Sequence, residues 1–208
     1  MESPEQPDDI VSSARLETFA DGVFAIAITL LVLEIHIPEA GENVGKALLG
    51  QWPSFLAYVT SFLTIGTIWA DHHRLFTVIR GTTYGFLFVN VLLLMPVAFL
   101  PYPTAVVARQ WFEGKDQVVP AMVLYGGTMA LVAVMFRAVW RYADSRRLLG
   151  AEAVRSRALR RRGDLIYRLA PLIYLAGAGA SVIDPILSLV VFLGLAIYWL
   201  YPVRSQPG

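Results

Sequence analysis

The side chains of this chain that could do chemistry are charged and polar groups that interrupt long apolar stretches. Arg15 and Asp21 stand at the start of an apolar run that extends to Pro38. A second polar cluster ends the next apolar run and consists of Trp69, Asp71, His72 and His73. Charged residues at such positions are costly in a membrane and usually serve a function.

The chemistry that these residues favour is ion pairing and hydrogen bonding between helices. A partly buried Arg15 needs a carboxylate or carbonyl partner, and we expect both Asp21 and Asp71 at its depth. A histidine of the second cluster could bridge the pair, and Asn90, inside a third apolar run, also needs a partner. Such a network could fix the packing of the helices or take part in gating, and the sequence supports both roles equally.

Metal binding and hydrolysis find little support in the sequence. His72 and His73 are adjacent, so on a helix their side chains point about 100° apart, and His36 is expected at the opposite membrane face. The chain has no cysteine, which excludes disulfides and thiolate chemistry, and it lacks the usual hydrolase motifs. We therefore expect no enzyme activity, no metal site and no cofactor.

The composition of the chain is typical of an integral membrane protein. Of its 208 residues, 56% are hydrophobic, and the mean hydropathy is +0.57. We predict an all-α fold with six transmembrane helices in one domain over residues 15–204, flanked by tails at 1–14 and 205–208. The expected helices are Thr18 to Ile37, Trp52 to His73, Thr82 to Leu100, Val118 to Trp140, Leu165 to Val182, and Asp184 to Tyr201.

Prolines set several of these boundaries. We expect the third helix to end at Pro101 and Pro103, because proline cannot donate a backbone hydrogen bond, and we expect Pro96 to kink it. At the last helix, Asp184 suits the capping position and Pro185 the first helical position.

The distribution of basic residues predicts the orientation in the membrane. Nine arginines lie from Arg141 to Arg168, whereas the loops on the other side hold only Lys46, Arg109 and Lys115. The positive-inside rule then places both termini in the cytoplasm. The arginine-dense segment is better explained by contact with anionic lipid head groups than by nucleic-acid binding. Fifteen arginines against two lysines suggest a bacterium with a G/C-rich genome, so we expect the protein in the bacterial inner membrane.

One face of the first predicted helix carries a regular stripe. Phe19, Ile26 and Leu33 recur every seven residues, and Thr29 lies about one turn from Ile26. Such a stripe is most often a helix–helix or lipid contact, but it could also face other copies of the same helix. The second half of the chain does not repeat it, so a pore would need several chains around a closed symmetry axis.

The same residues resemble a known family. The pattern R-x-x-x-F-[A/S]-D at Arg15 to Asp21, with Ala20 where serine is more usual, resembles the opening of the first helix in the transmembrane protein 175 family of potassium channels. Ile26, Thr29 and Leu33 match the layout that follows, and the segments WADHHRLF and FLPYPT look like that family's second and third helices. The resemblance implies a homotetramer that conducts potassium ions along the first helix.

Selectivity in such a pore cannot come from a carbonyl filter, because the chain has no loop of the T-V-G-Y-G type. Rings of Ile26 and Leu33, with the neighbouring Leu30, would form apolar constrictions, and a ring of Thr29 hydroxyls would offer oxygen ligands. Glu34, near the outer end, could attract cations. We expect a modest preference for potassium.

Two other functions stay open at this point. A secondary transporter would also keep charged groups and broken helices in the membrane, although it would be expected to contain inverted repeats, which we do not find. A structural or lipid-binding membrane protein without conduction is the other alternative.

Overall fold

The computed structural model describes residues 13–150 and 157–200, and the side chains over 13–150 and 168–198. Most of the predicted N-terminal tail and all of the C-terminal tail lie outside these residues. The elements in chain order are α1 (Ala14–Leu30), η1 (Leu31–Glu34), α2 (Val44–Gly50), α3 (Trp52–Val78), α4 (Tyr84–Phe99), α5 (Pro101–Gln110), α6 (Lys115–Ser145), α8 (Arg157–Gly179), η2 (Ala180–Val182) and α9 (Pro185–Leu200). The predicted all-α class is confirmed.

The first helix begins earlier and ends sooner than hydropathy predicts. It starts at Ala14 and becomes the 3-10 helix η1 at Leu31, and Ile35 is already extended, with φ −82° and ψ 118°. The predicted end at Ile37 is therefore wrong. Leu31 is completely buried, and η1 packs against α3 and α5, so tertiary contacts at this point accompany the change in helix type.

The third helix ends close to where the sequence predicts, since α4 stops at Phe99, but the chain becomes helical again at once. Leu100 keeps right-handed helical angles, and Pro101 opens α5, which continues to Gln110. Prolines are tolerated in the first turn of a helix because the backbone N–H groups there have no partner within the helix. Thr104 helps the junction, since its hydroxyl donates to the Leu100 carbonyl at 2.8 Å.

The remaining boundaries differ in smaller ways. Both α3 and α6 extend beyond their predicted ends, to Val78 and Ser145. The predicted cap of the last helix is present, since Asp184 Oδ1 accepts from the Ile186 backbone N–H at 2.9 Å. Helix α2 was not predicted. It is only seven residues long and is capped by Asn43, whose side chain accepts from a backbone N–H.

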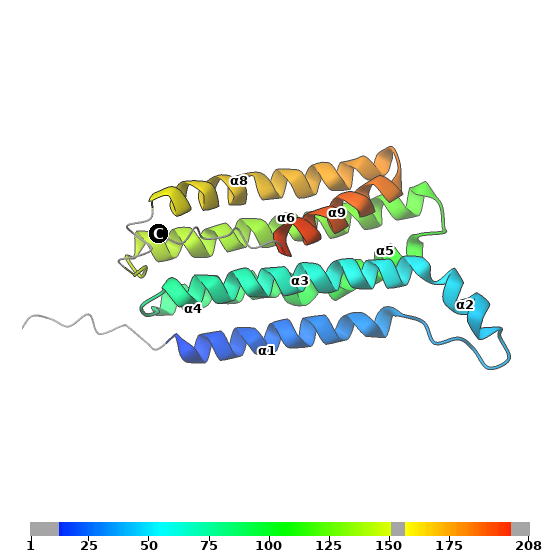
Figure 1. Ribbon diagram of the computed structural model, residues 1–208, viewed down its shortest axis with the longest axis horizontal. Helices are drawn as coiled ribbons and strands as arrows, with labels where there is room; N and C mark the ends of the chain where they lie inside the picture. The colour runs from blue at the N-terminus through cyan, green and yellow to red at the C-terminus, as the bar shows by residue number, and fades with distance from the viewer. Residues whose placement is uncertain (1–12, 151–156, 201–208) are drawn as a thin grey trace, which may run out of the picture.

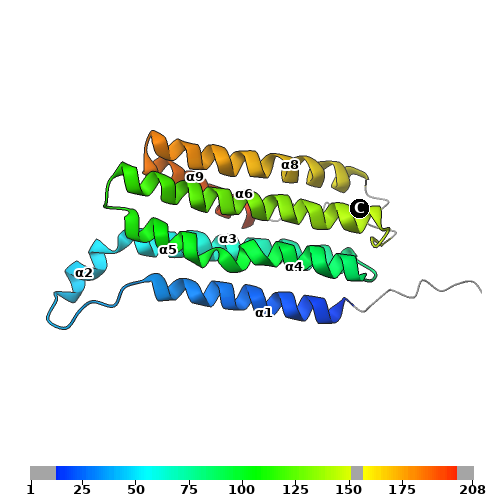
Figure 2. The ribbon, with the colours of Figure 1, turned by 180° about the vertical axis from the view of Figure 1, so that it is seen from behind.

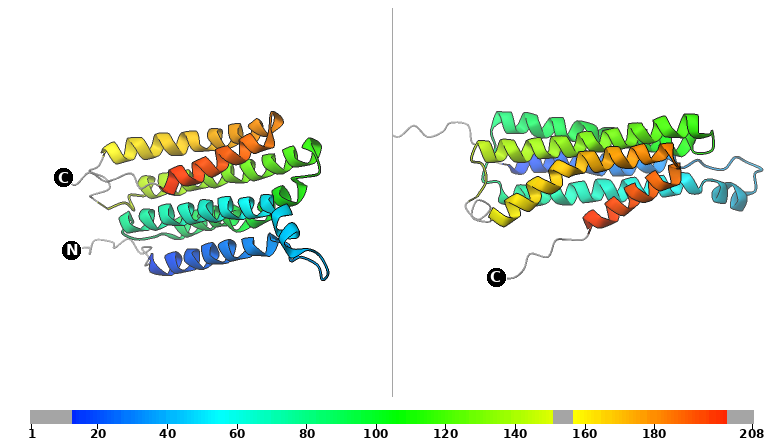
Figure 3. Two further views of the ribbon diagram at one scale, coloured as in Figure 1. Left: turned by 45° about the vertical axis from the view of Figure 1, so that its right-hand side comes forward. Right: turned by 90° about the horizontal axis from the view of Figure 1, so that it is seen from above.

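The long helices lie side by side and run roughly antiparallel (Figure 1, Figure 2). Helix α1 forms one edge, α3 and α4 follow, and α6 and α8 lie beyond them, while α9 crosses them at a slant (Figure 3). At one end of the bundle, the starts of α1, α4 and α8 lie together with the ends of α3 and α6 (Figure 1). We call it the arginine-rich end, because Arg74, Arg80 and Arg146 lie in or next to these helix ends. The opposite end, where α2 projects, is termed the far end.

The protein is a membrane protein with several spanning helices. Among the residues that the structure describes, four segments are long and apolar enough to cross a bilayer: Ala14–Glu34, Trp52–Val78, Tyr84–Gln110 and Lys115–Ser145. Two further apolar helices are shorter, at Arg168–Val182 and Pro185–Tyr198. Between them lies one hydrophobic core, to which α6 contributes Met122, Met129 and Phe136. This core supports α3 and α4, and these two helices in turn support α1.

Candidate functional site

Helix α1 has one face buried in the bundle and one face that the chain leaves uncovered. The buried side chains follow helical spacing and are Leu16, Ala20, Phe24, Ala27 and Leu31. The uncovered face carries the side chains of the predicted ion path, which are Ile26, Thr29, Leu30 and Leu33. Ile26 is 61% exposed and Leu33 71% exposed, although both are large apolar residues. Phe19 lies on the same face, toward the arginine-rich end.

Thr29 is the polar residue in the middle of the uncovered face. Its hydroxyl donates to the Ile26 carbonyl at 2.9 Å, so the proton of the hydroxyl is already used. The oxygen lone pairs remain free to accept, and a threonine in this state can offer an oxygen to a cation. The apolar residues above and below it offer none.

Two polar contacts join α1 to α3 near the arginine-rich end. The Trp69 indole N–H donates to Asp21 Oδ1 at 2.8 Å, and His73 Nδ1 lies 3.0 Å from Glu17 Oε1. Trp69 and His73 also stack on each other, with ring centroids 6.3 Å apart. Glu17 and Asp21 lie one turn apart on α1, and their partners lie one turn apart on α3 in the reverse order, as antiparallel packing of the two helices requires. Together the two contacts fix the register of these helices.

A buried polar pair lies deeper in the bundle, between α1, α3 and α4. His72 Nε2 and Asn90 Oδ1 are 2.9 Å apart, and both residues are fully buried. Phe76 stacks on the His72 ring at 4.6 Å, and Phe24 of α1 meets it edge-on at 5.4 Å. His72 Nδ1 and Asn90 Nδ2 have no partner within the described chain.

The structure does not pair Arg15 as the sequence suggested. Arg15 is exposed and makes no hydrogen bond or ion pair with any residue whose side chain is described. Asp21 is bound by Trp69, and Asp71 forms an ion pair with Arg74 one turn away at 2.7 Å. The expectation that Asp21 or Asp71 pairs with Arg15 through a histidine is therefore wrong within the chain.

Sequence reasoning missed Glu17, and it missed the contact between Glu34 and Arg109. Glu17 could have been found, because it lies one turn from Asp21 and so shares its side of the helix. Glu34 and Arg109 form an ion pair, with Arg109 Nη2 3.2 Å from Glu34 Oε2, which ties η1 to α5 at the far end. They are 75 positions apart in the sequence, and no local pattern links them.

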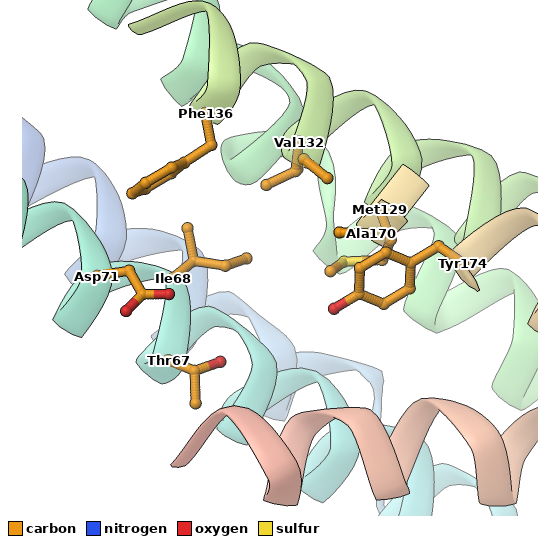
Figure 4. Close-up of a pocket in the computed structure, with 9 residues that line it drawn as sticks. Thr67, Ile68, Asp71, Met129, Val132, Phe136, Ala170 and Tyr174 are labelled. Carbon is orange, nitrogen blue, oxygen red and sulfur yellow. The ribbon is translucent and has the colours of Figure 1, made fainter. Parts of the chain in front are cut away.

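A small cavity of about 50 Å³ lies between α3, α6 and α8 (Figure 4). Its lining is mostly apolar, and Asp71 is its one carboxylate. That carboxylate is already paired with Arg74, so the cavity does not offer two free groups for acid and base chemistry. Within the part of the chain that the structure describes, no three histidine, aspartate or glutamate side chains gather as metal ligands.

Comparison with known proteins places the chain in a family. A sequence model of the family described as endosomal/lysosomal potassium channel TMEM175 matches residues 15–101. A potassium channel of Chamaesiphon minutus is 41% identical over 99% of this chain and 99% of its own length. This chain belongs to the TMEM175 family. The match to the TMEM175 model runs from α1 into the start of α5, so it includes the uncovered face of α1 and both groups of polar contacts.

Other TMEM175 proteins differ in length and in name. A potassium channel of Streptomyces collinus is 46% identical over 62% of this chain and 63% of its own length. The endosomal/lysosomal proton channel TMEM175 of Mus musculus is 40% identical over 52% of this chain, which is 24% of the mouse protein.

Solved structures agree with this assignment. The crystal structure of a lysosomal potassium-selective channel TMEM175 homolog from Chamaesiphon minutus matches with a TM-score of 0.76 and 37% identity, over 94% of this chain and 98% of that one. A variant of the potassium channel MtTMEM175 matches with a TM-score of 0.62 at 21% identity, over 94% of each chain, which supports the fold alone.

Proposed function

We propose that this chain is one subunit of a potassium-permeable channel and that α1 from several copies lines the ion path. The observation that carries the proposal is the uncovered face of α1. A membrane helix can expose apolar residues to lipid, but on this face Thr29 presents an oxygen between Ile26 and Leu33. The names of the relatives, potassium channels in bacteria, agree with this function.

Several copies are needed because one helix cannot enclose a water-filled path. Closed rotational symmetry would bring the uncovered faces of α1 together around an axis, and a tetramer is the arrangement that the family resemblance implies. Each ring of Ile26 and Leu33, with Leu30 beside them, would then narrow the path with apolar side chains. Water and ions are disfavoured at such constrictions, so these rings would limit conduction.

Selectivity in this arrangement would depend on hydroxyl and not carbonyl oxygens. A ring of Thr29 oxygens replaces only part of the hydration shell of an ion, whereas a carbonyl filter replaces all of it at several successive sites. We therefore expect potassium to be preferred over sodium only modestly.

The orientation in the membrane follows from the same proposal. The arginine-rich end would face the bacterial cytoplasm and its anionic lipid head groups, and both termini would lie there. Six spanning helices in one domain over residues 15–204 satisfy this orientation, with the two shorter helices, α8 and α9, as the fifth and sixth.

The test of the proposal is conduction by the purified protein in planar bilayers under a potassium gradient. We expect Ile26→Asn to raise the conductance, because a polar ring removes the dewetting barrier. In mixed potassium and sodium, the reversal potential should move toward the value of a channel that does not distinguish the two ions. Leu172→Asn on α8 is a matched control, since Leu172 is 62% exposed but lies outside α1. Silence of the wild-type protein, or saturable flux coupled to a counter-ion, would contradict the proposal.

A further inference from the structure

The outer part of α1 is held in a different way from the rest of the helix. From Leu31 to Glu34 the backbone is a 3-10 helix, and Ile35 leaves it in an extended conformation. A 3-10 turn has poorer hydrogen-bond geometry than an α-helix and is seldom stable over many residues. Leu33, on the uncovered face, belongs to this weaker turn, whereas Ile26 lies within regular α-helix.

Two contacts hold this turn against the bundle. Leu31 is buried against α3 and α5, and the Glu34 carboxylate accepts from Arg109 at 3.2 Å. The Glu34 side chain is only 24% exposed, while that of Arg109 is 73% exposed, so the arginine reaches from the surface of α5 over the carboxylate. Arg109 lies in the last turn of α5, where a positive charge is favoured by the helix dipole.

The ion pair also determines where the charge of Glu34 lies. Successive side chains in a 3-10 helix are about 120° apart, so Glu34 points away from Leu33. With Arg109 bound, the carboxylate is directed toward α5 and its charge is neutralised. Without Arg109, the same carboxylate would be free to swing toward the outer end of the uncovered face.

We infer that Arg109 is a positioning residue for the outer end of the ion path: through Glu34 it fixes the turn that holds Leu33. The inference rests on the proposed path along α1. It assigns a role to a residue outside the part of the chain that matches the TMEM175 family model. From the sequence, Arg109 was only one of the few basic residues expected on the non-cytoplasmic side of the membrane.

The absence of cysteine makes the chain a ready background for testing this inference by thiol modification. Leu33→Cys and Ile26→Cys would be introduced separately into the full chain, reconstituted in bilayers, and exposed from the outer side to a cationic or an anionic methanethiosulfonate reagent. The rate of current change reports access to each thiol. The measurement would then be repeated with Arg109→Gln or Glu34→Gln added.

If Arg109 positions the turn, both second substitutions should speed modification at Leu33→Cys by about two- to fivefold, the population change that loss of an exposed ion pair produces. The change should have the same direction for both reagents. Modification at Ile26→Cys should stay unchanged, because its turn does not depend on the ion pair. A chain with Glu34→Arg and Arg109→Glu together should return to the wild-type rate.

A purely electrostatic role would give a different result. Arg109→Gln would then speed the cationic reagent and slow the anionic one, Glu34→Gln would do the opposite, and 1 M salt would remove both effects, since the Debye length falls to about 3 Å. That result, or unchanged rates at Leu33→Cys, would overturn the inference alone. If neither thiol is modified in the presence of Arg109, α1 does not line the path and the proposed function fails with it.

Discussion

The buried pair of His72 and Asn90 offers the most direct test of how α1 is supported. We consider Asn90→Leu, which keeps the branching and the number of heavy atoms of the side chain and removes its polar atoms. In the native chain His72 Nε2 has Asn90 Oδ1 as its partner at 2.9 Å, and Nδ1 has none among the described residues. The substitution would leave both ring nitrogens of a fully buried histidine without a partner.

The cost can be bracketed from two general measures. Removing the partner of a buried polar group typically costs about 1–3 kcal/mol. Hydrogen bonds between membrane helices are worth about 0.6 kcal/mol on average, because the reference state in the membrane also finds partners. We therefore expect Asn90→Leu to lower the free energy of unfolding by about 0.6–3 kcal/mol. For a chain of this size the melting temperature should fall by about 2–10 °C.

The double substitution His72→Phe with Asn90→Leu should be more stable than Asn90→Leu alone. It removes all four polar atoms, including His72 Nδ1 and Asn90 Nδ2, which are unpartnered in the native chain. The new phenylalanine would retain the ring contacts with Phe76 and Phe24. Its predicted stability is equal to or above that of the native chain.

The assay is thermal unfolding of the purified protein in detergent, with all four members of the double-mutant cycle. His36→Phe, which changes an exposed histidine at the far end, controls for the substitution itself. If the double variant is less stable than both single variants, the hydrogen bond does not govern the stability of this pair and the reasoning is refuted.

Three further predictions can be checked with the same protein. Trp69→Phe should preserve the ring packing but lose the indole N–H that Asp21 accepts, lowering stability by about 1 kcal/mol in the same unfolding assay. Gly126→Ala should destabilise by about 1–3 kcal/mol, because a Cβ there would lie 2.6 Å from a side-chain atom of α8, whereas Gly127→Ala, with nothing within 4 Å, should be neutral or stabilising. Thr29→Val should keep the shape of α1 and lower the potassium preference with little change in open probability; an unchanged reversal potential would remove Thr29 from the ion path.

The helices were predictable from sequence where their signals are local. Apolar length identified each long helix, and the Asp184 cap marked the start of the last one. Helix α2 escaped prediction because it is short and buries no residue, so neither apolar length nor periodicity marks it. The prolines marked the end of α4 correctly, but they did not show that α5 follows directly, because a proline in the first turn of a helix has no helical hydrogen bond to lose.

For the candidate site, the sequence predicted at which end of the helices the polar residues lie, but not which of them touch. Depth in the membrane can be estimated from sequence, and it correctly grouped the ends of α1 and α3. Which side chains meet then depends on the rotation of each helix about its axis. That rotation turns Trp69 toward Asp21 and Asp71 toward Arg74 on its own helix, and leaves Arg15 exposed.

The rotation of α1 itself has a physical cause in its acidic residues. The helix is apolar nearly all round, so hydrophobic periodicity does not decide which face packs against the bundle. Glu17, Asp21 and Glu34 all find partners on α3 or α5. By helical geometry Glu17 and Asp21 lie roughly opposite Ile26, with Glu34 closer to the side of the buried face. Because these three contacts form together in one rotation, residues outside the proposed ion path favour the rotation that leaves Ile26 and Leu33 uncovered.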